Sequence, residues 1–195
     1  MSRKIFVIQG HPDSSEAHFC HALEHSYADA AEAAGHSVRR VRIAGLDFPL
    51  LHSEKEFHGE LPPALRESRE ALLWAEHLVL IYPLWLGTMP ALVKAWLEQL
   101  FRPGIALSEP DATSAWPRAL LKDKSSRVVV TMGMPALAYR WFYRAHSLKS
   151  LERNILRFSG VGPISETLIG MVAADNPRAR EKYLEKMREL GQRGR

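Results

Sequence analysis

The sequence contains a single cysteine, Cys20, in 195 residues. One thiol excludes an internal disulfide framework, so nothing here requires an oxidising compartment. A chain of this length buries enough surface to fold without a disulfide or a structural metal. Cys20 borders the apolar face of a predicted helix, and we interpret it as a small buried filler rather than a nucleophile.

The sequence also lacks a long hydrophobic run. Its longest stretch without a charged residue, 78–93, contains Pro83, Gly87 and Pro90. Such a stretch is too short and too broken to span a bilayer as a helix. Only five uncharged residues separate Lys4 from Gly10, fewer than the apolar region of a signal peptide needs. We therefore expect a soluble, cytoplasmic protein without a transmembrane segment.

Most of the chain has no excess of positive or negative charge. The formal net charge is +4 and the pI is about 9.3, which can indicate nucleic-acid binding. However, residues 176–195 hold seven basic and three acidic side chains, and residues 1–175 hold 19 of each sign. The excess belongs to one tail, so we expect no nucleic-acid partner. We interpret this tail as a solvated helix lying on a sheet, with 193–195 frayed.

Short β-favouring runs alternate with segments of helical spacing along the chain. The predicted strands are 5–8, 38–43, 77–82, 127–131 and 164–171. The predicted helices are 16–34, 63–76, 90–101, 136–159 and 177–190, with long loops at 44–62 and 102–118. The run at 77–82 is fully apolar, as expected of a parallel strand covered on both faces. This alternation predicts a single doubly wound α/β domain over residues 1–195.

A ligand of such a sheet binds beyond the carboxyl ends of the strands. That rule points to three loops rich in glycine, proline or aromatic residues: 10–16, 83–88 and 132–138. The first loop contains neither G-x-G-x-x-G nor a P-loop pattern, which argues against a nicotinamide cofactor held permanently in the Rossmann manner. Ser14 and Ser15 could help a helix start to bind phosphate. Alternatively, one of them simply caps the helix.

The loop after the third strand, 82–90, combines Trp85 and aliphatic side chains with prolines and Gly87. This stiff, apolar surface suits a flat and weakly polar ligand such as an isoalloxazine ring. The same features are also compatible with a loop buried beneath a neighbouring subunit.

Two groups of polar side chains have helical spacing. Three histidines could form a metal site: His18, His21 and His25. No cysteine or carboxylate completes a usual ligand set, so we expect no metal. We place these histidines on the solvent side of the first helix. Five cations form either a solvated face or a receptor for the 2′-phosphate of NADPH: Arg140, Arg144, Lys149, Arg153 and Arg157.

Four motifs are recognisable together: Gly10-His11-Pro12, Tyr82-Pro83-Leu84-Trp85, Leu92-x-Lys94-x-Trp96-x-x-x-Leu100-Phe101 and Thr131-x-Gly133. Over residues 4–172 the chain resembles the flavodoxin-like NAD(P)H:quinone oxidoreductases, which include DT-diaphorase and modulator-of-drug-activity-type reductases. The resemblance implies a five-stranded sheet of order 2-1-3-4-5 with helices on both faces. It also implies a tightly bound flavin and a homodimer with the active site at the interface. The chain lacks the carboxy-terminal extension of longer members, which favours FMN, with FAD possible.

The resemblance also implies roles for individual residues. The phosphate and ribityl chain would be surrounded by His11, Ser14, Ser15, His18 and Phe19. The isoalloxazine would be lined by Pro83, Leu84, Trp85, Leu86 and Gly87. The pyrimidine edge would contact Thr131, Gly133 and Met134. Tyr139 would stabilise charge at the flavin N1/O2 side together with a histidine, for which His146 is the candidate, although the family spacing falls on Ala145.

The implied reaction is a ping-pong transfer of hydride from dissociable NAD(P)H, through flavin N5, to a quinone. Azo and nitro compounds are alternative planar acceptors. The competing hypothesis is a binding protein of the same fold: an electron carrier or a redox-sensing regulatory subunit without strong turnover. Carrier flavodoxins are strongly acidic, whereas residues 1–175 are neutral, so the enzyme is the favoured interpretation.

Overall fold

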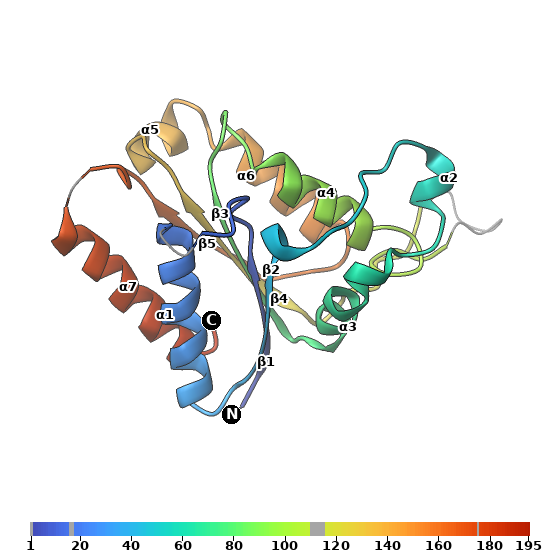
Figure 1. Ribbon diagram of the computed structural model, residues 1–195, viewed down its shortest axis with the longest axis horizontal. Coiled ribbons are helices and arrows are strands. Elements are labelled where there is room, and N and C mark those ends of the chain that lie inside the picture. Colours follow the sequence, from blue (N-terminus) through green and yellow to red (C-terminus); the bar gives the residue numbers. More distant parts are fainter. Residues whose placement is uncertain (1, 16–17, 110–115, 175) are drawn as a thin grey trace.

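Five parallel strands form one sheet in the order β2-β1-β3-β4-β5 (Figure 1). This computed structural model describes residues 2–15, 18–109, 116–174 and 176–195. The strands are β1 (Lys4–Gln9), β2 (Ser37–Arg42), β3 (His77–Pro83), β4 (Ser125–Thr131) and β5 (Ile164–Ile169). The predicted fold class and strand order are confirmed.

Helices cover both faces of the sheet. The helices of eight residues or more are α1 (Phe19–Ala33), α3 (Arg66–Trp74), α4 (Ala91–Leu100) and α7 (Pro177–Gln192). The shorter ones are α2 (Glu54–Phe57), α5 (Ala136–Trp141), α6 (His146–Ser150), the 3₁₀ turns η1 (Ile43–Gly45) and η2 (Pro63–Leu65), and the π-helical η3 (Leu151–Arg157). Figure 1 shows α1 and α7 on one face, and α3, α4 and α6 on the other. None of the helices in the described ranges is long and apolar enough to cross a bilayer.

Two hydrophobic cores follow from the alternation of side chains along the strands. Ile5 and Val7 of β1 pack beneath α1 and α7. Phe6 and Ile8 face the opposite core beneath α3 and α4. Every residue of β3 is buried, because this strand lies in the middle of the sheet with a neighbour on each side. The apolar character of 77–82 therefore reflects burial on both faces, as predicted.

The carboxy-terminal helix packs closely against the first helix. A Cβ placed on Gly191 would lie 2.2 Å from the backbone oxygen of Tyr27, so the two backbones approach too closely for a larger residue. The end of the chain is also held, because the Arg3 guanidinium donates to the backbone oxygen of Gly194 at 2.7 Å. The prediction of a frayed tail at 193–195 is therefore wrong. Met187 is buried in the α1–α7 core, so the tail is part of the fold.

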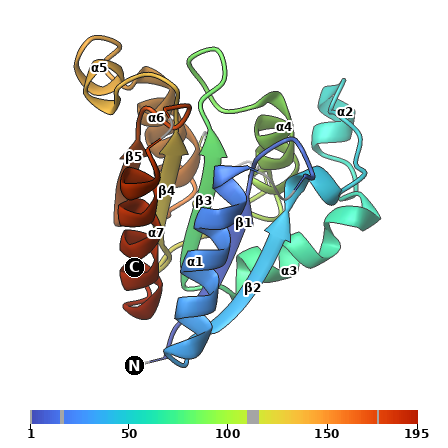
Figure 2. The same ribbon diagram turned by 60° about the vertical axis from the view of Figure 1, so that its left-hand side comes forward.

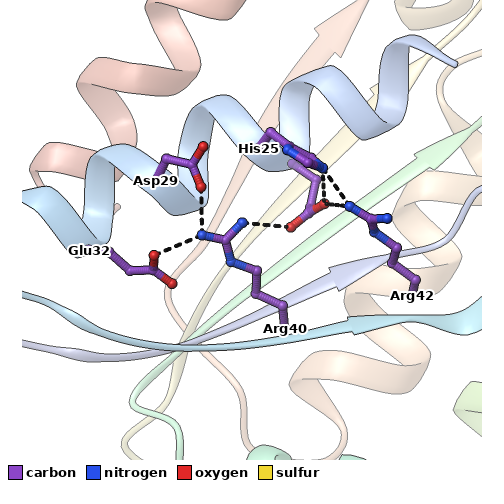
Figure 3. Close-up of polar contacts among 6 residues, drawn as sticks. His25, Asp29, Glu32, Arg40 and Arg42 are labelled. Carbon is purple, nitrogen blue, oxygen red and sulfur yellow. Dashed lines mark hydrogen bonds and ion pairs between the residues drawn. The ribbon is translucent and has the colours of Figure 1, made fainter. Parts of the chain in front are cut away.

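An ion-pair network around one buried carboxylate connects α1 to the edge strand β2 (Figure 3). Glu24 of α1 is only 1% exposed, and its two carboxylate oxygens lie 3.5 Å from Arg40 and 3.3 Å from Arg42. Arg40 also pairs with Asp29 at 2.6 Å and with Glu32 at 2.9 Å. Because a buried carboxylate needs such partners, Arg40 and Arg42 of β2 have a structural use. They also place charge on a sheet edge, which discourages pairing with another chain.

The predicted helix 136–159 is not continuous. Arg144 and Ala145 adopt left-handed backbone angles, with φ of 52° and 49°, and separate α5 from α6. The five predicted cations therefore do not lie along one helix, and Arg140 pairs with Glu166 of β5 at 2.6 Å. The segment 63–76 is likewise a 3₁₀ turn followed by α3, and the predicted loop 44–62 includes α2. Neither glycine nor proline marks the break at 144–145, so spacing alone gave no sign of it.

Candidate cofactor site

Backbone hydrogen bonds hold the predicted loops at the carboxyl edge of the sheet. The Gly10 amide donates to the Ile81 carbonyl at 2.7 Å, and the Leu84 amide donates to the Thr131 carbonyl at 2.7 Å. The Met132 amide donates to the Ile169 carbonyl at 2.8 Å. The three loops are thus attached to one another through the ends of neighbouring strands. This is the edge where ligands bind in open parallel sheets.

Gly10 allows the first loop to approach β3 and α4. A Cβ at this position would lie 2.7 Å from Cγ2 of Val93 and 3.2 Å from Cβ of Tyr82. A larger residue would therefore push the loop away from the sheet. The requirement for glycine in the first motif is steric and comes from the packing of this chain.

A cavity of about 690 Å³ opens between these loops, within the range of about 300–1,000 Å³ that small-molecule sites occupy. Eight of the residues predicted to bind a cofactor line it: His11, His18, Phe19, Pro83, Leu84, Trp85, Thr131 and Gly133. We call it the first cavity. A Cβ on Gly133 would meet no atom within 4 Å, so glycine there leaves space for a ligand rather than for neighbouring residues.

Stacked imidazoles form the end of the first cavity beside the start of α1. The rings of His11 and His18 stack with centroids 3.8 Å apart, and Nε2 of His18 lies 2.6 Å from Oδ2 of Asp13. The Asp13 amide donates to Nδ1 of His11 at 3.2 Å. Burial, together with the nearby His18, lowers the pKa of His11. His11 is therefore a neutral imidazole that accepts at Nδ1 and keeps a proton on Nε2 for donation.

The structure corrects two predictions for this segment. The three spaced histidines do not share a solvent face: His21 is 1% exposed, His18 lines the first cavity, and His25 alone is exposed. Neither Ser14 nor Ser15 caps the helix, because the residue before α1 is His18. Both serines are exposed and outside the cavity lining. Within the described ranges, no group of three or more His, Cys, Asp or Glu could hold a metal ion.

The loop after β3 ends in a tight turn. Trp85 and Thr88 exchange two backbone hydrogen bonds of 2.8 and 3.0 Å, and the two residues between them have positive φ, 47° at Leu86 and 82° at Gly87. Glycine accepts this conformation readily, whereas leucine does so at a cost of roughly 1–2 kcal/mol. The side chain of Leu86 is fully exposed at the tip. An apolar residue in a strained and exposed position indicates a functional constraint on the turn.

A second cavity of about 740 Å³ lies on the other side of this turn. Its lining is mainly apolar and includes Trp85, Leu86, Met89, Pro90, Leu151 and Ile155, with polar groups from Thr88, Lys94, His146, Ser147 and Ser150. Trp85 lines both cavities. The two cavities are therefore neighbours that share one indole.

The two predicted catalytic residues occupy different surroundings. Tyr139 is buried, and its hydroxyl lies 2.7 Å from Oγ of Ser147 and accepts from the Leu148 amide at 3.3 Å. His146 lines the second cavity. Tyr139 lines neither cavity directly. Leu86 belongs to the second cavity, and Gly87 and Met134 lie outside both linings.

Sequence reasoning missed the contribution of the chain after β5. Val172, Ala173, Arg180 and Leu184 complete the wall of the first cavity. Arg180 is the one lysine or arginine among the described residues of that lining, and its guanidinium donates to the Val172 carbonyl at 3.3 Å. The signal was present in the basic composition of the tail, but spacing alone did not indicate which cation would line the cavity.

Cys20 also lines the first cavity, and its thiol is unreactive. Burial raises the pKa of the Cys20 thiol to about 11, and Sγ lies 3.3 Å from Oγ1 of Thr131. Since the thiolate is the nucleophilic form, the structure agrees with the interpretation of a buried filler.

The donor set of the first cavity fits a ligand with a phosphate at one end and a flat ring at the other. Imidazoles and the N-terminus of the fifteen-residue α1 lie at one side, where backbone amides and the helix dipole favour an anion. Proline, leucine and tryptophan form the apolar side. The open space above Gly133 admits a ring close to the backbone.

Comparisons with known proteins agree with the observed fold. The profile of a family described by its flavodoxin-like fold matches residues 3–190. An uncharacterized NAD(P)H oxidoreductase of Haemophilus influenzae is 24% identical over 184 residues, which cover 92% of this chain and 89% of that protein.

Solved structures share the same fold. The NAD(P)H:quinone oxidoreductase of Methanothermobacter marburgensis superposes with a TM-score of 0.84 at 20% identity, covering 100% of both chains. An FMN-dependent NADH-azoreductase of Bacillus anthracis, solved in complex with FMN, superposes with a TM-score of 0.74 at 16% identity and 98% coverage of each chain.

Proposed function

The chain belongs to the family of flavodoxin-like fold whose profile spans residues 3–190, and on this premise we propose that it is an FMN-dependent NAD(P)H oxidoreductase that reduces a quinone or a similar planar acceptor. The observation that carries the proposal is the pair of adjoining cavities at the carboxyl edge of the sheet, which share Trp85. One has phosphate-binding character at the start of α1, and the other is mainly apolar.

FMN is proposed to occupy the first cavity, where it would supply two-electron redox chemistry. The Nε2 proton of His11 and the first amides of α1 would hold its phosphate. Arg180 would place a positive charge on the same cavity. Pro83, Leu84 and Trp85 would support the ring and exclude water from it. Orientation and electrostatics are thus the contribution of the chain.

NAD(P)H and the acceptor are proposed to enter the second cavity in turn, next to the shared indole of Trp85. Alternating occupancy of one cavity is compatible with a ping-pong reaction, in which the oxidised nicotinamide leaves before the acceptor is reduced. His146, predicted to stabilise developing charge, lines this second cavity. The mainly apolar lining suits a planar aromatic acceptor, and it does not by itself distinguish a quinone from an azo compound.

A homodimer is proposed to cover the apolar surface beside these cavities. Leu137, Trp141, Phe142 and Tyr143 in and after α5 are all exposed. Figure 2 shows α5 and the loop after β3 at the same end of the sheet. Large exposed apolar patches mark interaction sites. Sedimentation analysis of the purified protein tests this point, and a Trp141→Glu variant should shift the mass from dimer to monomer.

Anaerobic stopped-flow spectroscopy of the FMN-loaded protein tests the proposed activity. NADPH or NADH should bleach the flavin absorbance, and menadione added afterwards should restore it. Steady-state plots at several menadione concentrations should be parallel lines. A protein that binds FMN but is reduced by neither nicotinamide would instead favour the redox-sensing or electron-carrying alternative.

A further inference from the structure

Two hydroxyl groups connect the interior of the protein to the second cavity. The phenol oxygen of Tyr139 is buried beneath the surface of that cavity and lies 2.7 Å from Oγ of Ser147. Ser147 itself is part of the cavity lining. Neither motif spacing nor the family resemblance singled out this serine. It is nevertheless the residue through which Tyr139 reaches the cavity.

A third partner also contacts the phenol oxygen. The Leu148 amide donates to the Tyr139 oxygen at 3.3 Å, so the phenol accepts one hydrogen bond and has its own proton to donate. Either hydroxyl of the Tyr139–Ser147 pair can be the donor. When Tyr139 donates, Ser147 has its hydroxyl proton for another partner. A polarised chain of this kind makes the last hydroxyl a stronger donor.

The backbone that brings the two hydroxyls together is strained. Arg144 and Ala145 have left-handed φ values of 52° and 49°, and the Ala145 amide donates to the Tyr139 carbonyl at 3.0 Å. This turn folds the chain back so that Ser147 lies over Tyr139. Consecutive non-glycine residues in this conformation cost of order 1–3 kcal/mol each and are concentrated at functional sites.

Other polar groups of the second cavity have different partners. Lys94 forms an ion pair with Glu98 within its own helix, and Oγ of Ser150 accepts from the Asn154 amide group at 3.3 Å. In the described part of the lining, Ser147 is therefore the hydroxyl supported from behind by a buried donor chain.

We propose that Ser147 is a catalytic residue that donates a hydrogen bond to the carbonyl oxygen of a planar acceptor in the second cavity, and that Tyr139 is its positioning residue. The inference rests on the proposed function, because it places the acceptor in that cavity. Negative charge develops on the acceptor oxygen during reduction, and a preorganised donor stabilises it. Ser147 keeps its proton throughout, so the donor needs no further reactant.

The test compares Ser147→Ala, Tyr139→Phe and the double variant, all loaded with FMN, with menadione as the acceptor. Ser165→Ala is the matched control, since Ser165 is exposed on β5 and lines neither cavity. Loss of one preorganised donor lowers rates by up to about 100- to 1,000-fold. For this open cavity we expect at least about a 10-fold slower reoxidation by menadione in Ser147→Ala. The rate of reduction by NADPH, measured in the same variants, should fall less than the rate of reoxidation.

Non-additivity separates positioning from a merely structural role. If Tyr139 acts through Ser147, Tyr139→Phe slows reoxidation less than Ser147→Ala does, and the double variant equals Ser147→Ala. Additive effects would overturn the role of Tyr139. Equal reoxidation rates in Ser147→Ala and Ser165→Ala would overturn the role of Ser147. If the wild-type protein still turns over in that experiment, the proposed function stays intact.

A binding measurement keeps the inference testable if the wild type does not turn over. Menadione should quench the fluorescence of Trp85, which lines the second cavity. Weaker quenching in Ser147→Ala than in Ser165→Ala would support the donor even though the proposed function had failed. The same dissociation constant of menadione for both variants would overturn the role of Ser147 as a donor.

Discussion

At the residue scale, Glu152 is a carboxyl group with a raised pKa. Burial, together with the neighbouring carboxylate of Glu166, raises the pKa of Glu152 to about 7. Glu166 in turn pairs with Arg140 of α5 at 2.6 Å. The Glu152–Glu166 pair thus links η3 to β5, and the Arg140–Glu166 ion pair links β5 to α5.

We predict that this carboxyl pair makes stability depend on pH. The pKa of Glu152 is higher in the folded than in the unfolded protein, so its contribution is complete below the unfolded value and is lost as the pH rises through about 7. Partial exposure screens the effect to about 1–2 kcal/mol. Glu152→Gln should match the wild type in melting temperature at pH 5 and exceed it at pH 8. A constant difference across this range would contradict the assignment.

Arg180 gives a second prediction at this scale. Replacing it with Gln removes the cation of the first cavity and should weaken FMN binding about 10-fold or more, since hydrogen bonds to charged groups contribute about 1.5–3 kcal/mol. Arg178→Gln removes the same charge from the same helix outside the cavity lining and is the control. Fluorescence titration with FMN measures both. Equal weakening would indicate a general effect of net charge.

The residues of the site were only partly predictable from the sequence. Pro83 and Thr131 are the last residues of their strands, and His11 and Trp85 lie two residues beyond a strand end. Their loops therefore meet wherever the strands are parallel neighbours. Arg180 is distant in sequence and reaches the cavity because α7 packs against α1. Its role depends on tertiary packing, which the spacing of apolar residues does not encode.

At the element scale, the close packing of α7 on α1 supports the wall that Arg180 and Leu184 form. We predict that Gly191→Ala destabilises the protein, because the new methyl group would lie 2.2 Å from the Tyr27 carbonyl oxygen. Overpacking of this kind costs about 1–3 kcal/mol. Urea unfolding measures the change. Gly45→Ala is a suitable control, since a Cβ there meets no atom within 4 Å, and an equal loss in both variants would refute the close contact.

Strands were easier to predict than the segment after β4. Apolar runs such as 77–82 have few alternatives once both faces of the sheet are covered. The segment 136–159 has helical spacing throughout, yet the chain leaves the helix at Arg144 and Ala145. The Tyr139 hydroxyl stabilises that break, because it hydrogen-bonds with Oγ of Ser147 and accepts from the Leu148 amide. Tertiary contacts therefore override local helical preference at the place where the second cavity is built.

At the scale of the whole molecule, the basic excess of the sequence has a structural location. It lies on α7 and on the three residues that follow it. This helix contributes Arg180 to the first cavity, while other cations pair with carboxylates on the same helix, as Arg188 does with Glu185 at 2.7 Å. Positive charge beside a cavity attracts phosphorylated ligands. A cofactor and a co-substrate that both carry phosphate are consistent with this field.

The visible absorption spectrum of the purified protein tests the central claim most directly. The account predicts a yellow protein with flavin bands, from which heat releases a chromophore with the mass of FMN. A preparation that has lost its cofactor should regain the bands when FMN is added. A colourless protein that gains no flavin bands with FMN or FAD would contradict the assignment of the first cavity, and the proposed function with it.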